Sequence, residues 1–287
     1  MFSILRATTL EIACDALALL ITLSALALST FAGALHYHQF GEPARMAREA
    51  GLSAIMVCGV MFCIFSCVRT IRREIESQTA QMALSHSITR GGFLCAKILG
   101  VVAAYAVFFV TVLANSITSV RGSVLGAEAA HGGIARVWGP SLAIGVATMV
   151  APLVIAAILN RFFRMRFVRS ATLLMLFMSI AGAFYRFDFS LAVREIGISL
   201  ALVPLAIFFT VLAGALAARF SANVATALSF IAVGFSLPVF GSHYLADAVV
   251  RDAPVPWGYV ALTYAAAAPL VAAAAFAGVH FINTREV

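Results

Sequence analysis

The chain has 287 residues, of which 63% are hydrophobic and only 11% are charged. Soluble domains carry about 25% charged residues, and a soluble core cannot hide so large a share of apolar side chains. The composition therefore excludes a soluble enzyme, a disordered tail and a secreted disulfide scaffold, and it indicates a membrane protein. The net charge of +7 does not indicate nucleic-acid binding, because the basic residues stand in short breaks between apolar runs, as membrane topology requires.

Eight stretches of the sequence contain no Asp, Glu, Lys or Arg, and together they hold most of the chain. A membrane-spanning helix needs about 20 mostly apolar residues, and only a helix satisfies the backbone of one such stretch on its own. We therefore predict an all-α polytopic membrane protein, a bundle of about eight transmembrane helices. In chain order the stretches are 16–41, 50–68, 98–120, 137–160, 170–185, 196–218, 220–246 and 253–284.

The fifth stretch, 170–185, is the shortest at 16 residues. Its flanking residues Arg169 and Arg186 have side chains long enough to reach both interfaces, which keeps it a candidate span. Its length also suits half of a broken or re-entrant helix. The alternative prediction is therefore six transmembrane helices plus re-entrant helices.

The charges in the loops predict the orientation. With the N-terminus inside, twelve of the nineteen basic residues fall on the inner side, and the loop Arg161–Arg169 carries four arginines and no acid. This bias predicts that both termini are cytoplasmic. The first stretch is longer than the signal-peptide apolar region of about 7–15 residues, so we interpret it as an uncleaved span. Residues 1–287 are predicted to form a single transmembrane domain.

The sequence offers little that catalysis or ion coupling needs. Asp15 is the one ionisable residue that we place well inside an apolar stretch, near the inner end of the first span. Ion-coupled carriers usually need several such groups at mid-depth. The pair His36 and His38 is too small a ligand set for a metal. Lys97 is the only lysine, and Ala96 before it excludes a Walker A loop. We predict no enzyme activity, catalytic residue, metal or cofactor in this chain.

The cytoplasmic loop 69–97 is the most informative segment. Its first half is amphipathic at helical spacing, and Arg72 and Glu76 stand four residues apart on the polar side. Ser87 or Thr89 is placed to cap the helix that enters the third span. We therefore expect a short interfacial helix, a turn and a transmembrane helix. The apolar stripe of the first helix holds Ile71, Ile75 and Met82.

This loop resembles the signature stretch of the permeases of type-2 ABC exporters. Those permeases carry a pattern like Arg-Glu-x-Glu-x-Gly-Thr, a leucine-rich turn, Ser-x-Pro-(Ile/Val)-Ser-Arg and a Gly-Lys-x-x-Gly-like approach to the third span. The matching residues are Arg73, Glu74, Glu76, Thr79, Leu84, Ser85, Ile88, Arg90, Lys97 and Gly100. The departures are Gln78 for the glycine, Ser87 for the proline, Thr89 for the serine and Ala96 before the lysine.

The resemblance implies a subunit of a larger machine in the cell inner (plasma) membrane. Such a permease is half of a transmembrane dimer, and two ATP-binding cassette subunits, which hold ATP and Mg, dock beneath it. The helix at about 70–84 would be the coupling helix, resting in a cleft of the ATPase. The basic loop 161–169 would contact membrane lipid or the ATPase. The residues expected to contact the ATPase are Arg72, Arg73, Glu74, Glu76, Thr79 and Arg90.

Two other functions remain open from the sequence. The first is an ABC-type membrane partner that transmits ATPase force to an extracytoplasmic or assembly protein without moving a solute. The second is an ion-coupled carrier or a membrane enzyme, which would require polar groups at mid-depth or a catalytic cluster. The transported substrate is not encoded in any pattern that we find.

Overall fold

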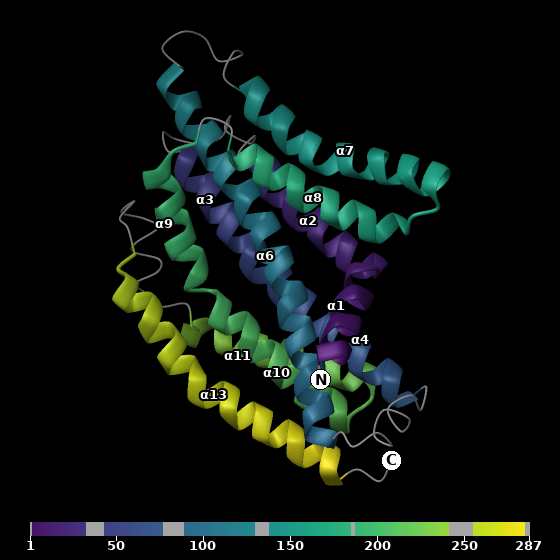
Figure 1. Cartoon of the computed structure of the whole chain (residues 1–287). Coiled ribbons are helices and arrows are strands. Elements are labelled where there is room, and N and C mark those ends of the chain that lie inside the picture. Colours follow the sequence, from purple (N-terminus) through teal and green to yellow (C-terminus); the bar gives the residue numbers. More distant parts are fainter. Residues whose placement is uncertain are drawn as a thin grey trace.

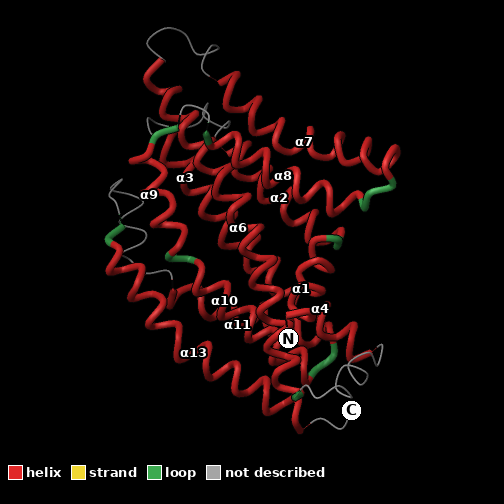
Figure 2. The backbone as a smooth tube through the Cα atoms, viewed as in Figure 1, coloured by secondary structure: helices red, strands yellow, loops and turns green. Residues whose placement is uncertain are grey.

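A computed structural model of the chain describes residues 2–32, 43–76, 89–129, 138–184, 187–240 and 255–284. Over these ranges the chain is helical and holds no strand (Figures 1 and 2). In chain order the helices are α1 (Phe2–Ala13), α2 (Ala16–Ala32), α3 (Pro43–Ser53), the π-helix η2 (Ala54–Cys58), α4 (Gly59–Glu76), α6 (Arg90–Ala129), α7 (Trp138–Phe163), α8 (Phe167–Ala183), α9 (Phe189–Leu200), α10 (Val203–Arg219), α11 (Ala222–Phe240) and α13 (Trp257–Thr284).

The all-helical membrane class is confirmed, whereas the count of eight spans is not. Five described helices are long and apolar enough to cross a membrane, and α1 with α2 makes a sixth if the pair, bent by 62°, counts as one span. The stretches 170–185 and 220–246 contain the shorter apolar helices α8 and α11. Each run without charge therefore contains helical residues, but it did not fix the length of the helix, and α1 lies outside these runs. The five long spans are Ala44–Glu76, Arg90–Leu125, Leu142–Phe163, Phe189–Arg219 and Trp257–Thr284.

Helix α6 is the centre of the bundle. It packs against α1, α2, α3, α4, α7, α8, α9, α10 and α13, and it runs through the middle of the molecule in Figure 1. Its 40 residues correspond to about 60 Å at 1.5 Å per residue, roughly twice the thickness of the hydrocarbon core. Helices α2, α7 and α8 pack on one another, and so do α10 and its neighbours α11 and α13. The central helix connects these two groups.

Helices α3, η2 and α4 follow one another without a break from Pro43 to Glu76. The π-helical turn at Ala54–Cys58 lies in the apolar part of this span. Gly51 allows α3 to approach α6 closely, because a Cβ atom at this position would lie 1.9 Å from the Ser116 hydroxyl. The span is thus straight enough to join the two ends of the bundle along one face of α6.

The first and the last described residues of the chain lie at the same end of the bundle. The end of α4 contacts α1 through Arg73 and Glu11, and the start of α6 contacts the end of α13 through Arg90 and Ile282. We call this the inner end, after the predicted orientation, and the opposite end, which holds α3 and α9, the outer end. That the inner end faces the cytoplasm stays a prediction.

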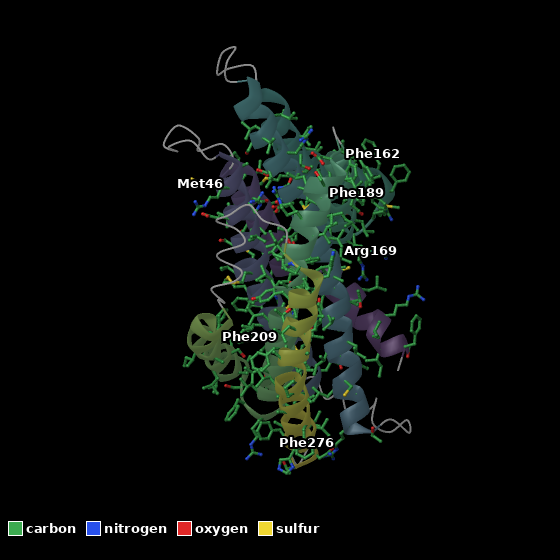
Figure 3. The ribbon with its side chains drawn as sticks, turned by 90° about the vertical axis from the view of Figure 1, so that its left-hand side faces the viewer. Met46, Phe162, Arg169, Phe189, Phe209 and Phe276 are labelled. Atoms are coloured by element: carbon green, nitrogen blue, oxygen red, sulfur yellow. The ribbon has the colours of Figure 1, made fainter. Side chains whose placement is uncertain are left out.

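The outer surfaces of two helices are apolar and exposed. Most of the apolar window of α13 and of α7 is not buried within the chain, and side chains such as Val154 and Phe276 face outward. Phe162 at the end of α7 and Phe276 on α13 are labelled in Figure 3. Such faces suit contact with lipid. The bundle is therefore buried around α6 and open to an apolar surrounding at α7 and α13.

Candidate coupling site at the inner end

The predicted coupling segment begins as a continuation of α4. Residues 70–76 are the last two turns of the helix that starts at Gly59, so the first half of the expected helix at about 70–84 is helical and is continuous with the preceding span. The reason is local: no glycine or proline interrupts this part of the sequence, so nothing ends the helix. Residues 77–84, with Met82, lie outside the described residues.

The amphipathic pattern of this segment is confirmed where it is described. Ile71 is fully buried and Ile75 is partly buried against the main core. On the other face, Nη2 of Arg72 donates to Oε1 of Glu76 over 3.0 Å, and Glu76 is exposed. The predicted pair at spacing four therefore exists. Because Glu76 is in water, the pair contributes no more than about 0.5 kcal/mol to folding.

The only lysine of the chain is buried and joins α6 to α4. The Lys97 side chain is 2% exposed, and its Nζ donates to Oε1 of Glu74. Oε2 of Glu11 lies 4.0 Å from the same nitrogen. A buried ammonium is tolerated when it is paired, and two carboxylates from different helices provide this here. The pair ties the end of α4 to the beginning of α6.

Glu11 of α1 and Asp15, which follows α1, bring two carboxylates to the charges around Lys97 and the end of α4. Nη1 of Arg73 donates to Glu11 over 3.2 Å, and Nη1 of Arg69 lies 3.0 and 3.2 Å from the two oxygens of Asp15. Asp15 stands in the break between α1 and α2, where its Oδ1 also accepts a bond from the backbone N–H of Leu17. A carboxylate is favourable at a helix N-terminus. We call these six residues, Glu11, Asp15, Arg69, Arg73, Glu74 and Lys97, the inner network.

The start of α6 is held by a cap and by a close helix crossing. Oγ1 of Thr89 accepts from the backbone N–H of Gly92 over 3.1 Å, so Thr89 is the predicted cap, whereas Ser87 lies outside the described residues. Arg90 reaches the carbonyl of Ile282 on α13. At Gly100 a Cβ atom would lie 2.6 Å from Thr8. Gly100 therefore lets α1 lie directly against α6.

The structure brings four of the six predicted contact residues to the end of α4. Arg72 and Glu76 pair with each other, while Arg73 and Glu74 contact Glu11 and Lys97 within the chain. Arg90 lies at the start of α6, against α13. Thr79 lies outside the described residues. Contact of these residues with an ATPase subunit stays a prediction.

A pocket of about 420 Å³ opens beside the inner network. Helix α1 and the inner part of α4 form its walls, and Arg166, from the connection between α7 and α8, completes them. In Figure 1 this connection lies on the right of the molecule, above α1 and the end of α4. The lining includes three arginines and two acids, and its members are Ala7, Leu10, Glu11, Ile12, Cys14, Asp15, Arg69, Thr70, Arg73 and Arg166.

A second set of charges at the outer end was not expected. Nε of Arg48 on α3 donates to Oε1 of Glu195 on α9 over 2.6 Å, with side-chain exposures of 1% and 2%. Nearby, Arg121 on α6 pairs with Asp188 over 3.1 Å. We call Arg48, Glu195, Arg121 and Asp188 the outer network. The prediction that buried ionisable groups are nearly absent is wrong, because Arg48 and Glu195 flank the apolar stretches in sequence yet are buried by packing between helices.

Asp188 also caps α9. Its Oδ1 accepts from the hydroxyl and backbone N–H of Ser190 and from the N–H of Leu191, at 2.7, 3.0 and 3.3 Å. The hydrogen bond from the Ser190 hydroxyl is the main cause that lowers the pKa of Asp188, and the N–H of Leu191 and the charge of Arg121 act in the same direction. The acid is therefore held in its charged form beside the outer end of α6.

The middle of the bundle holds polar groups without charge. Nδ2 of Asn115 on α6 donates to the hydroxyls of Ser29 and Thr30 on α2, at 2.8 and 3.0 Å, and Oδ1 accepts from Thr148 on α7 at 3.1 Å. All four side chains are buried. Sequence reasoning did not identify this neutral cluster. An amide in the apolar stretch 98–120 is the signal that indicates such a cluster.

Comparison of the chain with protein-family models, with curated proteins and with solved structures finds no match. The class of the protein follows from its own fold: an all-helical chain with several long apolar helices, typical of a multi-pass membrane protein. Within the described ranges, no group of three or more His, Cys, Asp or Glu side chains is arranged to hold a metal ion.

Proposed function

We propose that this chain is the permease subunit of an ABC transporter of the exporter type, driven through its inner end by separate ATP-binding subunits. The observation that carries the proposal is the inner network. It links the two helices that flank residues 77–88 to each other and to α1. A displacement applied to that segment would therefore move three helices together.

The first step of the argument concerns α4 and α6. Glu74 lies two residues before the end of α4, and Lys97 lies about two turns into α6, and their ion pair joins the two helices close to the undescribed segment. Lys97 is buried and Glu74 is partly exposed, so losing one partner is expected to cost about 1–3 kcal/mol, and the pair resists separation when the segment is pushed. The helix ends then respond as one rigid body. A receiver of mechanical force needs this property.

The second step concerns the path from the inner end to the rest of the bundle. Helix α6 contacts both helix groups, and α1 is bent by 62° against α2. Movement of the joined α4 and α6 would therefore change the position of α1 at its bend and of α2 beyond it. A driven transporter is a helix bundle with two arrangements, and a ligand bound to a partner chain shifts the equilibrium between them.

The source of energy has to lie in other chains. The sequence offers no Walker A loop, so ATP and Mg would be held by two copies of an ATPase subunit. The membrane part would be a dimer of this chain or a pair with a related permease. We place the complex in the cell inner (plasma) membrane. The exposed carboxylate of Glu76, which Arg72 holds in place, would meet the ATPase, where charges set docking orientation more than affinity.

Purification of the tagged full chain in mild detergent tests this proposal. We expect a P-loop ATPase to co-purify in a fixed ratio. In vesicles that contain the complex, changing Glu76 and Thr79 together to alanine is expected to lower ATP hydrolysis coupled to transport by about tenfold, because a charged docking contact is lost. Normal coupling in this variant, or a chain that purifies without an ATPase, would contradict the proposal.

The outer end provides the matched control. Arg45 and Glu49 form a pair at spacing four on α3, over 2.9 Å, as Arg72 and Glu76 do on α4, and the glutamate is exposed in both pairs. Glu49→Ala removes the same chemistry from the opposite end and is expected to leave coupling unchanged. The same vesicles separate transport from force transmission: ATP hydrolysis that depends on the chain while no solute moves would favour the force-transmitting membrane partner.

A further inference from the structure

The pocket beside α1 has the size and the lining of a ligand site. Its volume of about 420 Å³ falls within the range of about 300–1,000 Å³ that small-molecule sites occupy. Apolar side chains such as Leu10 and Ile12 line one part, and the guanidinium groups of Arg69, Arg73 and Arg166 line another. With Glu11 and Asp15 the lining carries an excess of one positive charge. The site is therefore suited to an anion with an apolar portion.

Arg166 is the residue that gives the pocket this character. Within the described ranges, its guanidinium reaches only the sulfur of Cys14, at 4.0 Å, which is a weak acceptor. The connection from α7 to α8 passes through the left-handed region at Arg164, where φ is 53°. This turn brings Arg166 to the mouth of the pocket while Arg164 stays outside the lining. Arg166 thus lines the pocket as a cation that, within the described ranges, has no strong acceptor of its own.

The other two arginines keep donors for a ligand. Arg69 contacts Asp15, and Arg73 contacts Glu11, each through its Nη1. A guanidinium has five N–H donors in a rigid fork, so these contacts fix the orientation of each group and use only part of its hydrogen-bonding capacity. Three arginines around one space form the arrangement that binds phosphate well.

We propose that this pocket binds the phosphate group of an anionic phospholipid from the inner leaflet. Exposed apolar side chains that are close in sequence to the residues of the lining favour a lipid over a free phosphate. Phe162, Phe163 and Met165 precede Arg166 in the chain and are exposed. Phe2 of α1 is 78% exposed. Aromatic and basic side chains together are typical of the depth at which lipid headgroups meet acyl chains. This proposal does not rest on the proposed transport function.

Native mass spectrometry of the full-length chain in mild detergent tests the site. The probes are phosphatidylglycerol, phosphatidylcholine and inorganic phosphate. We expect one phosphatidylglycerol molecule to stay bound, and phosphatidylcholine to bind more weakly because its choline is repelled by the arginines. Arg166→Gln is expected to weaken retention of phosphatidylglycerol about tenfold, since it removes a charged hydrogen-bond donor. Arg166 is exposed, so this variant is expected to fold.

Arg164→Gln is the matched control. Both arginines are exposed in the same connection, but only Arg166 lines the pocket. We expect Arg164→Gln to change retention by less than about twofold, as a screened surface charge does. Equal losses in the two variants would mean diffuse attraction to the basic loop and would overturn the proposal. Displacement of the lipid by millimolar inorganic phosphate would also overturn it, because the pocket would then be a site for the free anion.

Discussion

The inner and the outer network hold charges of the same kinds in opposite ways. At the outer end, both partners of Arg48–Glu195 are almost completely buried. At the inner end, burial is graded: Lys97 is buried, Glu74 is partly exposed, and Arg73 is 73% exposed. A fully buried pair has no water to replace a lost partner, whereas an exposed arginine can exchange one partner for another. The pair Arg48–Glu195 of the outer network is therefore a fixed joint between α3 and α9, and the inner network can respond to a ligand.

The polar groups between the two networks support this comparison. Asn115 joins α6 to α2 and α7 without any charge. The apolar middle of the bundle is thus connected by neutral hydrogen bonds, which are modest in membranes. Movement at the inner end would meet little resistance in the middle and strong resistance at the outer joint. Four variants test this comparison, from the largest expected loss of stability to the smallest.

The largest loss is expected from Glu195→Leu. The substitution leaves the Arg48 guanidinium buried without its main acceptor, which costs about 3–5 kcal/mol of folding free energy. Thermal unfolding in mild detergent measures the effect. The double variant Arg48→Leu with Glu195→Leu is the control, because it removes the orphaned charge and is expected to recover much of the loss. A double variant as unstable as the single one would show that the charge is not the cause.

A smaller loss is expected from Lys97→Met, which keeps most of the apolar side chain. Glu74 and Glu11 are 25% and 32% exposed, so water solvates the carboxylates that lose the ammonium, and Arg73 stays beside Glu11. We expect a loss of about 1–3 kcal/mol in the same unfolding measurement. A loss equal to that of Glu195→Leu would mean that the inner network is as rigid as the outer one.

Asn115→Ala is expected to cost about 1–2 kcal/mol. The hydroxyls that it leaves behind already have backbone acceptors in their own helices: Ser29 donates to Leu26, and Thr148 donates to Gly145. Few polar groups are therefore left without a partner. Thr148→Val removes a single bond of the cluster and is expected to cost less than Asn115→Ala in the same assay. A larger loss of stability from Thr148→Val than from Asn115→Ala would mean that Asn115 is not the main link of this cluster.

The smallest effect concerns acid pH at the outer end. The folded pKa of Asp188 is lowered, so its contribution to stability is fully present above the unfolded value of about 3.9. This contribution is lost as the pH falls from there through the folded pKa. Asp188→Asn is expected to lose stability at neutral pH and to show a weaker decline between neutral and acid pH. Unfolding curves of both proteins over this pH range, with the exposed Glu49→Gln as control, measure the difference.

Local features of this fold could be predicted from the sequence, and distant contacts could not. The stripe of Ile71 and Ile75, the cap at Thr89 and the pair Arg72–Glu76 depend on residues a few positions apart, so helical spacing reveals them. Arg48 and Glu195 are 147 positions apart, and their contact follows only from the way α3 and α9 meet. The same is true of the pocket, which takes Arg166 from a loop far from α1 and α4.

The π-helical turn Ala54–Cys58 lies between the two networks and lets the span hold an extra residue. Arg48 precedes this turn and Glu74 follows it on the same continuous span. Each residue turns an α-helix by about 100°, and a π-helical bulge holds extra chain within one turn. Deleting one residue of the turn would restore α-helical winding and keep Arg48 against Glu195. Glu74 would then keep nearly its present direction toward Lys97, because the π-helical turn already absorbs the extra residue. Deleting a residue from the α-helical part of the span instead would rotate Glu74 by about 100° away from Lys97.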